Sequence, residues 1–280
     1  VPHVLTAHSL EPLRPWKAEQ LGGGYQLSAW VEKTAIETAA AIIAVSDGMR
    51  ADLLSAYPFV DPSKVHTIRN GVDTTLFTPN YDSAVLEKYG IRGRYALFVG
   101  RITRQKGLAH LLRAWSEVPA EYGLVIAAGS ADEPRIGKEV ASLINALRQT
   151  RTNVWWIEEM MPHSELTALL TSADLFLCPS IYEPLGIVNL EAMGCETAVL
   201  ASAVGGIPEV VAHGVTGELV RYSTNSEEFE LDFREAIVRL MGQPDLLQQY
   251  VRAGRSRAQK EFGWRAIATA TIALHESGIP

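Results

Sequence analysis

Residues 95–107 have the sequence YALFVGRITRQKG. Five apolar residues, Tyr95–Val99, lead directly into a loop between Gly100 and Gly107. A short apolar run of this kind is typical of a strand that is buried on both faces of a parallel sheet. A helical pattern follows the loop, so the segment indicates the first strand, loop and helix of a βαβ series.

Five further apolar runs continue this series towards the C-terminus. They are predicted as strands at 124–128, 153–157, 174–178, 198–201 and 217–220. A helical stretch follows each of the first five strands, which predicts a complete, doubly wound Rossmann-like domain. Three more helices are predicted to finish the chain, at 226–241, 244–261 and 264–276.

The residues before this series predict a smaller sheet. Strands are expected at 3–7, 41–46 and 64–68, with helices at 25–40 and 47–56. Pro79 and the polar residues around it predict a linker that runs to about residue 93. The fold class is therefore α/β, with an incomplete Rossmann-like domain at 1–75 and a complete one at 76–263. Because Val1 leads straight into an apolar run, we expect N-terminal strands to be missing.

The composition excludes some classes of function. The chain has 280 residues, 47% of them hydrophobic, and a formal net charge of −7. This charge argues against a general nucleic-acid or membrane-surface binder, and no apolar run approaches the ~18–20 residues that a membrane span needs. Cys178 and Cys195 lie in apolar segments and are expected to be buried, reduced thiols. A cytoplasmic protein is predicted, and its oligomeric state is left open, a homo-oligomer included.

Ligands of an open α/β sheet bind at the carboxyl ends of its strands. The loop after the strand at 95–99 places Arg101 and Lys106 at such an end. The planar guanidinium of Arg101 can chelate a phosphate, and Lys106 can add a point charge as the next helix begins. The alternative is a solvated loop that is basic without binding anything.

The loop after the strand at 174–178 is a second candidate. Residues 179–193 have the sequence PSIYEPLGIVNLEAM, and a helix is expected to start near Leu185 or Gly186, with free amides that favour an anion. Glu183 and Glu191 would repel an anion, so we interpret them as acceptors for sugar hydroxyls. The alternative is that Glu183 caps the helix and Glu191 is exposed. A diphosphate between two sugars would fit both loops, which predicts a nucleotide-sugar ligand.

Two further strand ends give weaker signals. After the strand at 198–201, Gly205, Gly206 and Pro208 could bring backbone close to the same site. His8 follows the first strand and either faces a ligand or has a structural role. The sequence has no Walker A loop, no Gly-x-Gly-x-x-Gly and no Asp-x-Asp metal pair, so no cofactor or metal is expected.

Three motifs together give a family resemblance. They are VGR-x4-KG at 99–107, Glu183-x7-Glu191 within YEPLGIVNLEAM at 182–193, and GGIPEVV at 205–211. On these motifs the whole chain resembles the family 4 retaining GT-B glycosyltransferases. The stretches TAHSLEPLRPWK at 6–17 and IEEM at 157–160 are similar to the actinobacterial (Corynebacterium-type) glycogen synthases, a group that includes enzymes making maltose-1-phosphate.

The resemblance implies a role for each matching residue. Arg101 and Lys106 would hold the donor diphosphate, assisted by the backbone amides of Leu185, Gly186 and Ile187. Glu191 would bind the ribose hydroxyls, Glu183 the transferred glucose, and Met160 would lie near the nucleobase. His8 would orient the transferred sugar or the acceptor. The helix at 264–280 would pack back on the first domain.

The implied activity is a metal-independent hexosyl transfer with retention of configuration. Glucose would move from ADP-glucose or UDP-glucose to an α-1,4-glucan in glycogen synthesis. The alternatives are transfer to glucose-1-phosphate, which gives maltose-1-phosphate, and a donor-binding fragment without catalysis. A nucleotide-sugar epimerase or a phosphorylase of the same architecture is a further alternative.

Overall fold

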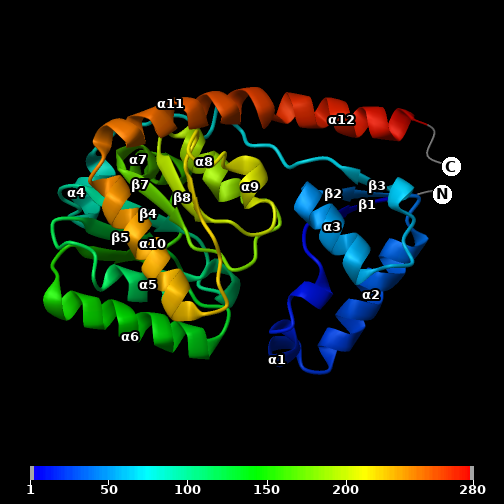
Figure 1. Cartoon of the computed structure of the whole chain (residues 1–280), viewed down its shortest axis with the longest axis horizontal. Helices are drawn as coiled ribbons and strands as arrows, with labels where there is room; N and C mark the ends of the chain where they lie inside the picture. The colour runs from blue at the N-terminus through cyan, green and yellow to red at the C-terminus, as the bar shows by residue number, and fades with distance from the viewer. Residues whose placement is uncertain (1–2, 278–280) are drawn as a thin grey trace. The chain divides into compact units, whose positions relative to one another are not determined.

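The computed structural model describes residues 3–277, which form two compact units (Figure 1). One unit comprises the residues up to Gly71 together with those from Phe262 onward, and the other is Val72–Glu261. The chain therefore crosses between the units a few residues before each expected boundary. Among the described residues, no helix has the length and apolar character that a bilayer crossing requires.

The first unit contains a three-stranded parallel sheet in the order β1-β2-β3. The strands are β1 (Val4–Ala7), β2 (Ala41–Ala44) and β3 (Val65–Thr67), and the helices are α1 (Lys17–Leu21), α2 (Gly24–Thr38), α3 (Asp47–Ala56) and α12 (Trp264–Glu276), with 3-10 turns η1 (Glu11–Leu13) and η2 (Pro62–Lys64). Every residue of β2 is buried, as its central place requires. Ser46 caps α3 by accepting the Met49 N–H at 2.8 Å.

Helix α12 belongs to this first unit, although 190 residues of the other unit precede it in the chain. Its first residue, Trp264, lies so close to Gly71 that a side chain on Gly71 would have its Cβ 3.0 Å from the indole. Residues 278–280 of the expected helix lie outside the described residues. Helix α1 was not expected from the sequence, because five residues are too few to show a helical periodicity.

The second unit contains a six-stranded parallel sheet in the order β6-β5-β4-β7-β8-β9. Its strands are β4 (Tyr95–Val99), β5 (Gly123–Ala127), β6 (Val154–Ile157), β7 (Leu175–Cys178), β8 (Ala198–Ser202) and β9 (Glu218–Val220). The order reverses between the neighbours β4 and β7, which is the switch point where such sheets bind ligands. The two loops singled out in the sequence follow these two strands.

Helices cover this sheet and explain its apolar strands. They are α4 (Ala84–Tyr89), α5 (Leu108–Trp115), α6 (Pro134–Thr150), α7 (His163–Ser172), α8 (Ile187–Gly194), α9 (Ile207–Val210), α10 (Ser226–Met241) and α11 (Pro244–Glu261). Phe98, Ile126 and Leu177 pack in one core cluster with residues of α5, α6 and α10. Leu97 and Val125, which point to the other face, are also fully buried. Both faces are covered, so the strands are apolar without alternation.

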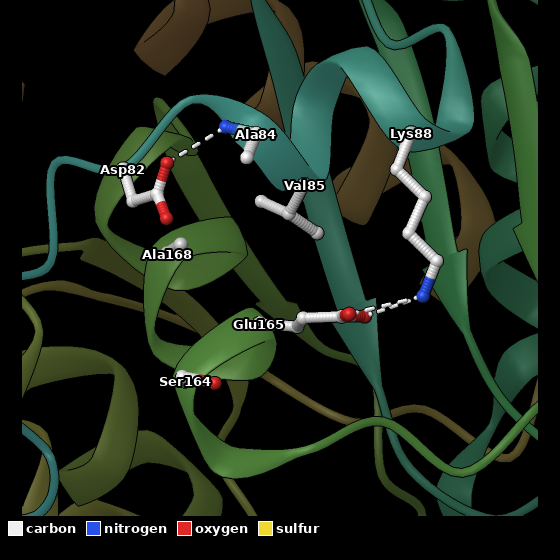
Figure 2. Close-up of a pocket in the computed structure, with 7 residues that line it drawn as sticks. All are labelled: Asp82, Ala84, Val85, Lys88, Ser164, Glu165 and Ala168. Carbon is white, nitrogen blue, oxygen red and sulfur yellow. Dashed lines mark hydrogen bonds and ion pairs between the residues drawn. The ribbon is translucent and has the colours of Figure 1, made fainter.

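The expectation of a linker up to about residue 93 is wrong, because α4 forms there and packs on α7. Asn80 N–H donates to the Thr171 hydroxyl at 3.0 Å, and Lys88 pairs with Glu165 at 2.9 Å. Figure 2 shows Val85 of α4 facing α7 and the side chains of Lys88 and Glu165 closing one side of the pocket between the helices. Tertiary packing stabilises this six-residue helix, which local sequence alone does not predict.

Candidate active site

The loops after β4 and β7 are in backbone contact. Ile181 N–H donates to the carbonyl of Gln105 at 2.8 Å. Gly107, between η3 (Arg104–Lys106) and α5, has φ +66°, and a Cβ there would lie 1.9 Å from the carbonyl oxygen of Pro179. A side chain at this position is therefore excluded, which explains the glycine after Lys106. The strand-end loops thus converge, as the sequence predicts.

A second glycine holds the other side of the β7 loop. Gly205 has φ +51°, and its Cβ would lie 2.0 Å from the carbonyl oxygen of Glu183. Gly206 N–H donates to that same oxygen at 3.0 Å. The Gly-Gly pair after β8 therefore fixes the backbone at Glu183, which is a more specific role than the general close approach expected.

Lys106 and Glu183 form the central contact of the site. The Lys106 Nζ donates to the Glu183 Oε2 at 2.6 Å, and both side chains are largely buried. Burial alone would lower the pKa of Lys106, but the charge of Glu183 and the hydrogen bond to it outweigh burial and raise the pKa above its ordinary value. Lys106 is therefore a cation held in place beside the loop that precedes α8.

The alternative that Glu191 is exposed is wrong, and the carboxylate of Glu183 has the Lys106 ammonium as its partner. Glu191 is half-buried on α8, and burial raises its pKa, an effect that the charge of Lys106 partly offsets. Both carboxylates therefore lie near the same ammonium.

Arg101 was expected to face the turn at residues 183–187, but its side chain pairs with a different loop. Its Nη1 pairs with Asp132 at 3.1 Å, and its side chain is 69% exposed. The charge of Arg101 nevertheless lowers the pKa of Lys106, so the two cations are near enough to interact. Arg101 and Asp132 both line a cavity of about 600 Å³ at the carboxyl ends of β4, β5 and β6.

Met160 also lines this cavity, and its side chain is 98% exposed. The other lining residues include Gly129, Ser130, Glu158 and Glu159. The motif spacing does not indicate the loop after β5, yet that loop supplies Asp132, Gly129 and Ser130. Its position at the carboxyl end of a strand is the signal that points to it.

Helix α8 starts at Ile187, later than the expected Leu185 or Gly186. Gly186 is its N-cap with φ +90°, and a Cβ there would lie 2.7 Å from the side-chain Nδ2 of Asn189. Leu185 is buried, with 2% of its surface exposed. The segment Leu185–Ile187 therefore forms a tight turn that leads from the Glu183 loop into the helix.

His8 lies in the first unit, directly after β1. Its side chain is exposed, and its Nδ1 lies 3.4 Å from the Nδ2 of Asn70. The structure thus places His8 at the carboxyl edge of the smaller sheet, as the sequence predicts, while its role with a ligand stays a prediction. Among residues 3–277 there is no group of three or more His, Cys, Asp or Glu side chains able to hold a metal ion.

Two Rossmann-like parallel sheets in one chain, with converging strand-end loops at the switch point of the larger sheet, define a GT-B glycosyltransferase fold. Solved structures share this fold. Sucrose-phosphate synthase from Thermosynechococcus elongatus matches 97% of this chain and 66% of its own with a TM-score of 0.81 and 28% identity. Anabaena Alr3699/HepE in complex with UDP-glucose matches 99% and 72% with a TM-score of 0.81 and 22% identity.

Sequence comparison gives the family. The model of the group 1 glycosyl transferases matches residues 66–257, and that of Glycosyltransferase Family 4 matches residues 1–76. The chain therefore belongs to the group 1 glycosyl transferases, and it is a hexosyltransferase. A retaining mechanism is consistent with this family. The alpha-maltose-1-phosphate synthases of Mycolicibacterium smegmatis and Mycobacterium tuberculosis (strain H37Rv) are 54% and 50% identical to it over 98% of this chain and 73% of their own.

Proposed function

We propose that this protein transfers glucose, with retention, from ADP-glucose or UDP-glucose to glucose-1-phosphate and so forms maltose-1-phosphate. The names of its 54% and 50% identical relatives support this acceptor over the α-1,4-glucan of glycogen synthesis, which was the first expectation and becomes the second candidate. The Lys106–Glu183 contact at 2.6 Å is the observation that most supports a nucleotide-sugar site. A buried, oriented cation at a switch point suits a diphosphate.

The donor diphosphate is proposed to bind between Lys106 and the turn that starts α8. A phosphate oxygen would accept a hydrogen bond from the Lys106 ammonium, which would release Glu183 to accept from hydroxyls of the transferred glucose. Amides of the turn Leu185–Ile187 would add donors. Arg101, which already lines the cavity through its pair with Asp132, would bind the diphosphate with its guanidinium fork.

The nucleoside is proposed to occupy the cavity that Met160 lines, with its ribose hydroxyls donating to Glu191. The cavity of about 600 Å³ has the volume of a small-molecule site. His8 is proposed to orient the transferred sugar or the acceptor, as the family resemblance implies. UDP-glucose is bound by the Anabaena protein of similar fold, which supports a nucleotide-sugar donor in general and leaves the base to experiment.

Catalysis is proposed to rest on charge stabilisation. Lys106 and Arg101 would offset the negative charge that develops on the departing nucleoside diphosphate as the glucosyl group becomes oxocarbenium-like. The acceptor hydroxyl would then attack from the face that the leaving group vacates, which retains the anomeric configuration. Because the two side chains supply the positive charge, the reaction is proposed to need neither a metal ion nor a cofactor.

Product analysis tests the acceptor. With ADP-glucose and glucose-1-phosphate as substrates, we expect one maltose-1-phosphate to form for each ADP released. Both products are measured by ion-exchange chromatography and mass spectrometry. UDP-glucose in a parallel reaction ranks the two donors by kcat/KM. Elongation of glycogen without maltose-1-phosphate would favour the second candidate. Calorimetric binding of ADP-glucose without any transfer would favour a donor-binding module.

Replacing Glu191 by glutamine is expected to separate function from stability. Burial raises the pKa of Glu191 above its ordinary value of 4.5, so the folded state holds this proton to a higher pH than the unfolded state. The free energy of unfolding therefore falls as the pH rises from the unfolded pKa through the folded one. Glu191→Gln removes that loss, so urea unfolding should show a gain in stability above pH 4.5 that is absent at lower pH.

The same variant is expected to raise the donor KM by roughly 10-fold or more, because a neutral amide replaces a charged acceptor of the ribose hydroxyls. Glu235→Gln, on the exposed face of α10, is the matched control and should change neither quantity. A donor KM equal to that of the parent protein would remove Glu191 from the ribose site.

A further inference from the structure

Asn189 is a polar residue on a buried face of α8. None of its surface is exposed, and the same holds for its helix neighbours Leu190 and Met193. Neither its side-chain Oδ1 nor its Nδ2 has a hydrogen-bond partner among the described residues. A buried amide without a partner destabilises the folded state, whereas an apolar residue of similar volume does not. An asparagine at this position therefore points to a role other than stability.

The amide of Asn189 lies beside the side chain of Glu183. A Cβ on Gly186 would lie 2.7 Å from the Asn189 Nδ2 and 3.5 Å from the Glu183 Cγ. The two side chains therefore approach the same point next to the Gly186 backbone. Because Gly186 has no side chain, this space stays open between them.

The thiol of Cys178 lies in the same group of side chains. Burial raises the pKa of the Cys178 thiol, and the charge of Glu183 raises it further. Lys106 and Asn189 act in the opposite direction, so all four side chains are close enough to interact. The thiol contacts the Ser180 hydroxyl at 3.5 Å and is only a weak hydrogen-bonding group. The Asn189 amide thus adjoins the Lys106–Glu183 pair with its donor capacity largely unused.

The Lys106–Glu183 pair has to change when a nucleotide sugar binds. In the free protein the Glu183 carboxylate accepts from the Lys106 ammonium at 2.6 Å. In the proposed donor complex the ammonium donates to a phosphate oxygen instead. A buried carboxylate that loses its cation is strongly destabilised unless another donor replaces it. The Asn189 amide is a donor that a side-chain rotation can bring to this carboxylate.

We infer that Asn189 is a positioning residue, whose amide donates to Glu183 when the donor diphosphate takes over Lys106. This inference rests on the proposed function for the exchange at Lys106. The Glu183 carboxylate has two oxygens, so one accepts from the amide while the other accepts from a hydroxyl of the transferred glucose. Asn189 makes and breaks no covalent bond, because its contribution is to hold Glu183 charged and oriented.

The first test is the affinity of the intact protein for ADP, measured by calorimetry. Asn189→Val is expected to weaken ADP binding on the order of 10-fold, the loss of one hydrogen bond to a charged group. The kcat/KM for the nucleotide sugar should fall by at least the same factor. Thr197→Val is the matched control, since the Thr197 hydroxyl is also buried but donates to the Leu170 carbonyl at 2.6 Å. This control should change neither quantity.

The unfolding temperatures of these two variants are expected to move in opposite directions. Asn189→Val removes an unpartnered amide, so its unfolding temperature should equal or exceed that of the parent protein. Thr197→Val removes a satisfied hydrogen bond, so its unfolding temperature should fall. If Asn189→Val instead unfolded at a lower temperature and bound ADP as the parent protein does, Asn189 would have a structural role and the inference would be wrong.

Asn189→Asp gives a pH dependence that a structural role does not produce. The aspartate carboxylate cannot donate, and it lies beside Glu183, Lys106 and the Cys178 thiol. Once protonated, it donates through its hydroxyl. The ADP affinity of Asn189→Asp relative to the parent protein should therefore recover as the pH falls, whereas the deficit of Asn189→Val should stay constant. A deficit of Asn189→Asp that is equal at every pH would contradict the inference.

The amide itself can be followed in ¹H–¹⁵N NMR spectra. The side-chain signal of Asn189 is assigned by its absence in Asn189→Val, and its proton resonance should move downfield when ADP saturates the site. Asn153 is an internal control, because its Nδ2 already donates to the Ala120 carbonyl at 2.8 Å. Its signal should stay in place. An Asn189 signal that ADP does not move would overturn the inference.

These binding measurements separate the inference from the proposed function, because they do not involve the acceptor. If the parent protein forms no maltose-1-phosphate but Asn189→Val loses ADP affinity as expected, the proposed function fails and the role of Asn189 stands. If the parent protein forms maltose-1-phosphate and Asn189→Val equals it in ADP affinity and in kcat/KM, the proposed function stands and the role of Asn189 is excluded.

Discussion

Replacement of Lys106 by alanine is expected to lower kcat/KM for the nucleotide sugar by about 10²- to 10³-fold, the effect of removing one oriented charge donor at a reacting group. The ammonium is 2.6 Å from Glu183, and both side chains are largely buried. Steady-state measurement of the released nucleotide gives the rates. The same substitution leaves the Glu183 carboxylate buried without its partner, which should lower the free energy of unfolding by about 3 kcal/mol.

A double variant separates these two effects. In Lys106→Ala/Glu183→Gln the uncompensated charge is gone, so stability in urea should return towards that of the parent protein while activity stays low. Lys138→Ala, which removes an exposed cation on α6 of the same unit, should behave as the parent protein in both measurements. Near-normal turnover in Lys106→Ala would show that the diphosphate binds elsewhere.

The sequence predicts the elements whose periodicity is long or strongly apolar. The helices expected at 226–241, 244–261 and 264–276 have those bounds in the structure, and the strand at Tyr95–Val99 does too. Helices α1 and α4 have five and six residues, which is too short for a periodic signal, and contacts with distant residues stabilise α4. A local pattern contains no information about such contacts.

The convergence of Lys106 and Glu183 could be predicted because both follow strands that end at the same edge of the sheet. What the sequence does not show is the direction of each side chain. Arg101 pairs with Asp132, a residue whose loop has no recognisable motif, and this pair directs the guanidinium along the cavity wall. The glycines in the motifs also depend on partners far away in sequence, such as Pro179 for Gly107.

The substitution Gly205→Ala is expected to affect both stability and activity, because two penalties coincide at this position. Gly205 has φ +51°, which costs an L-residue about 1–2 kcal/mol. The new Cβ would also lie 2.0 Å from the carbonyl oxygen of Glu183, so backbone must shift, at about 1–3 kcal/mol more. The shift moves Glu183 away from Lys106, and a displacement near 1 Å at a reacting site can lower kcat/KM by about 100-fold.

Gly214→Ala carries only the first of these penalties, the conformational cost of a positive φ. Gly214 also has a positive φ, +74°, but a Cβ there would have no atom within 4 Å. This control should lose only the conformational term, about 1–2 kcal/mol in urea unfolding, and keep full activity. If Gly205→Ala matched Gly214→Ala in both measurements, the backbone at Glu183 would tolerate displacement, and the donor site would not depend on the position that Gly205 and Gly206 impose.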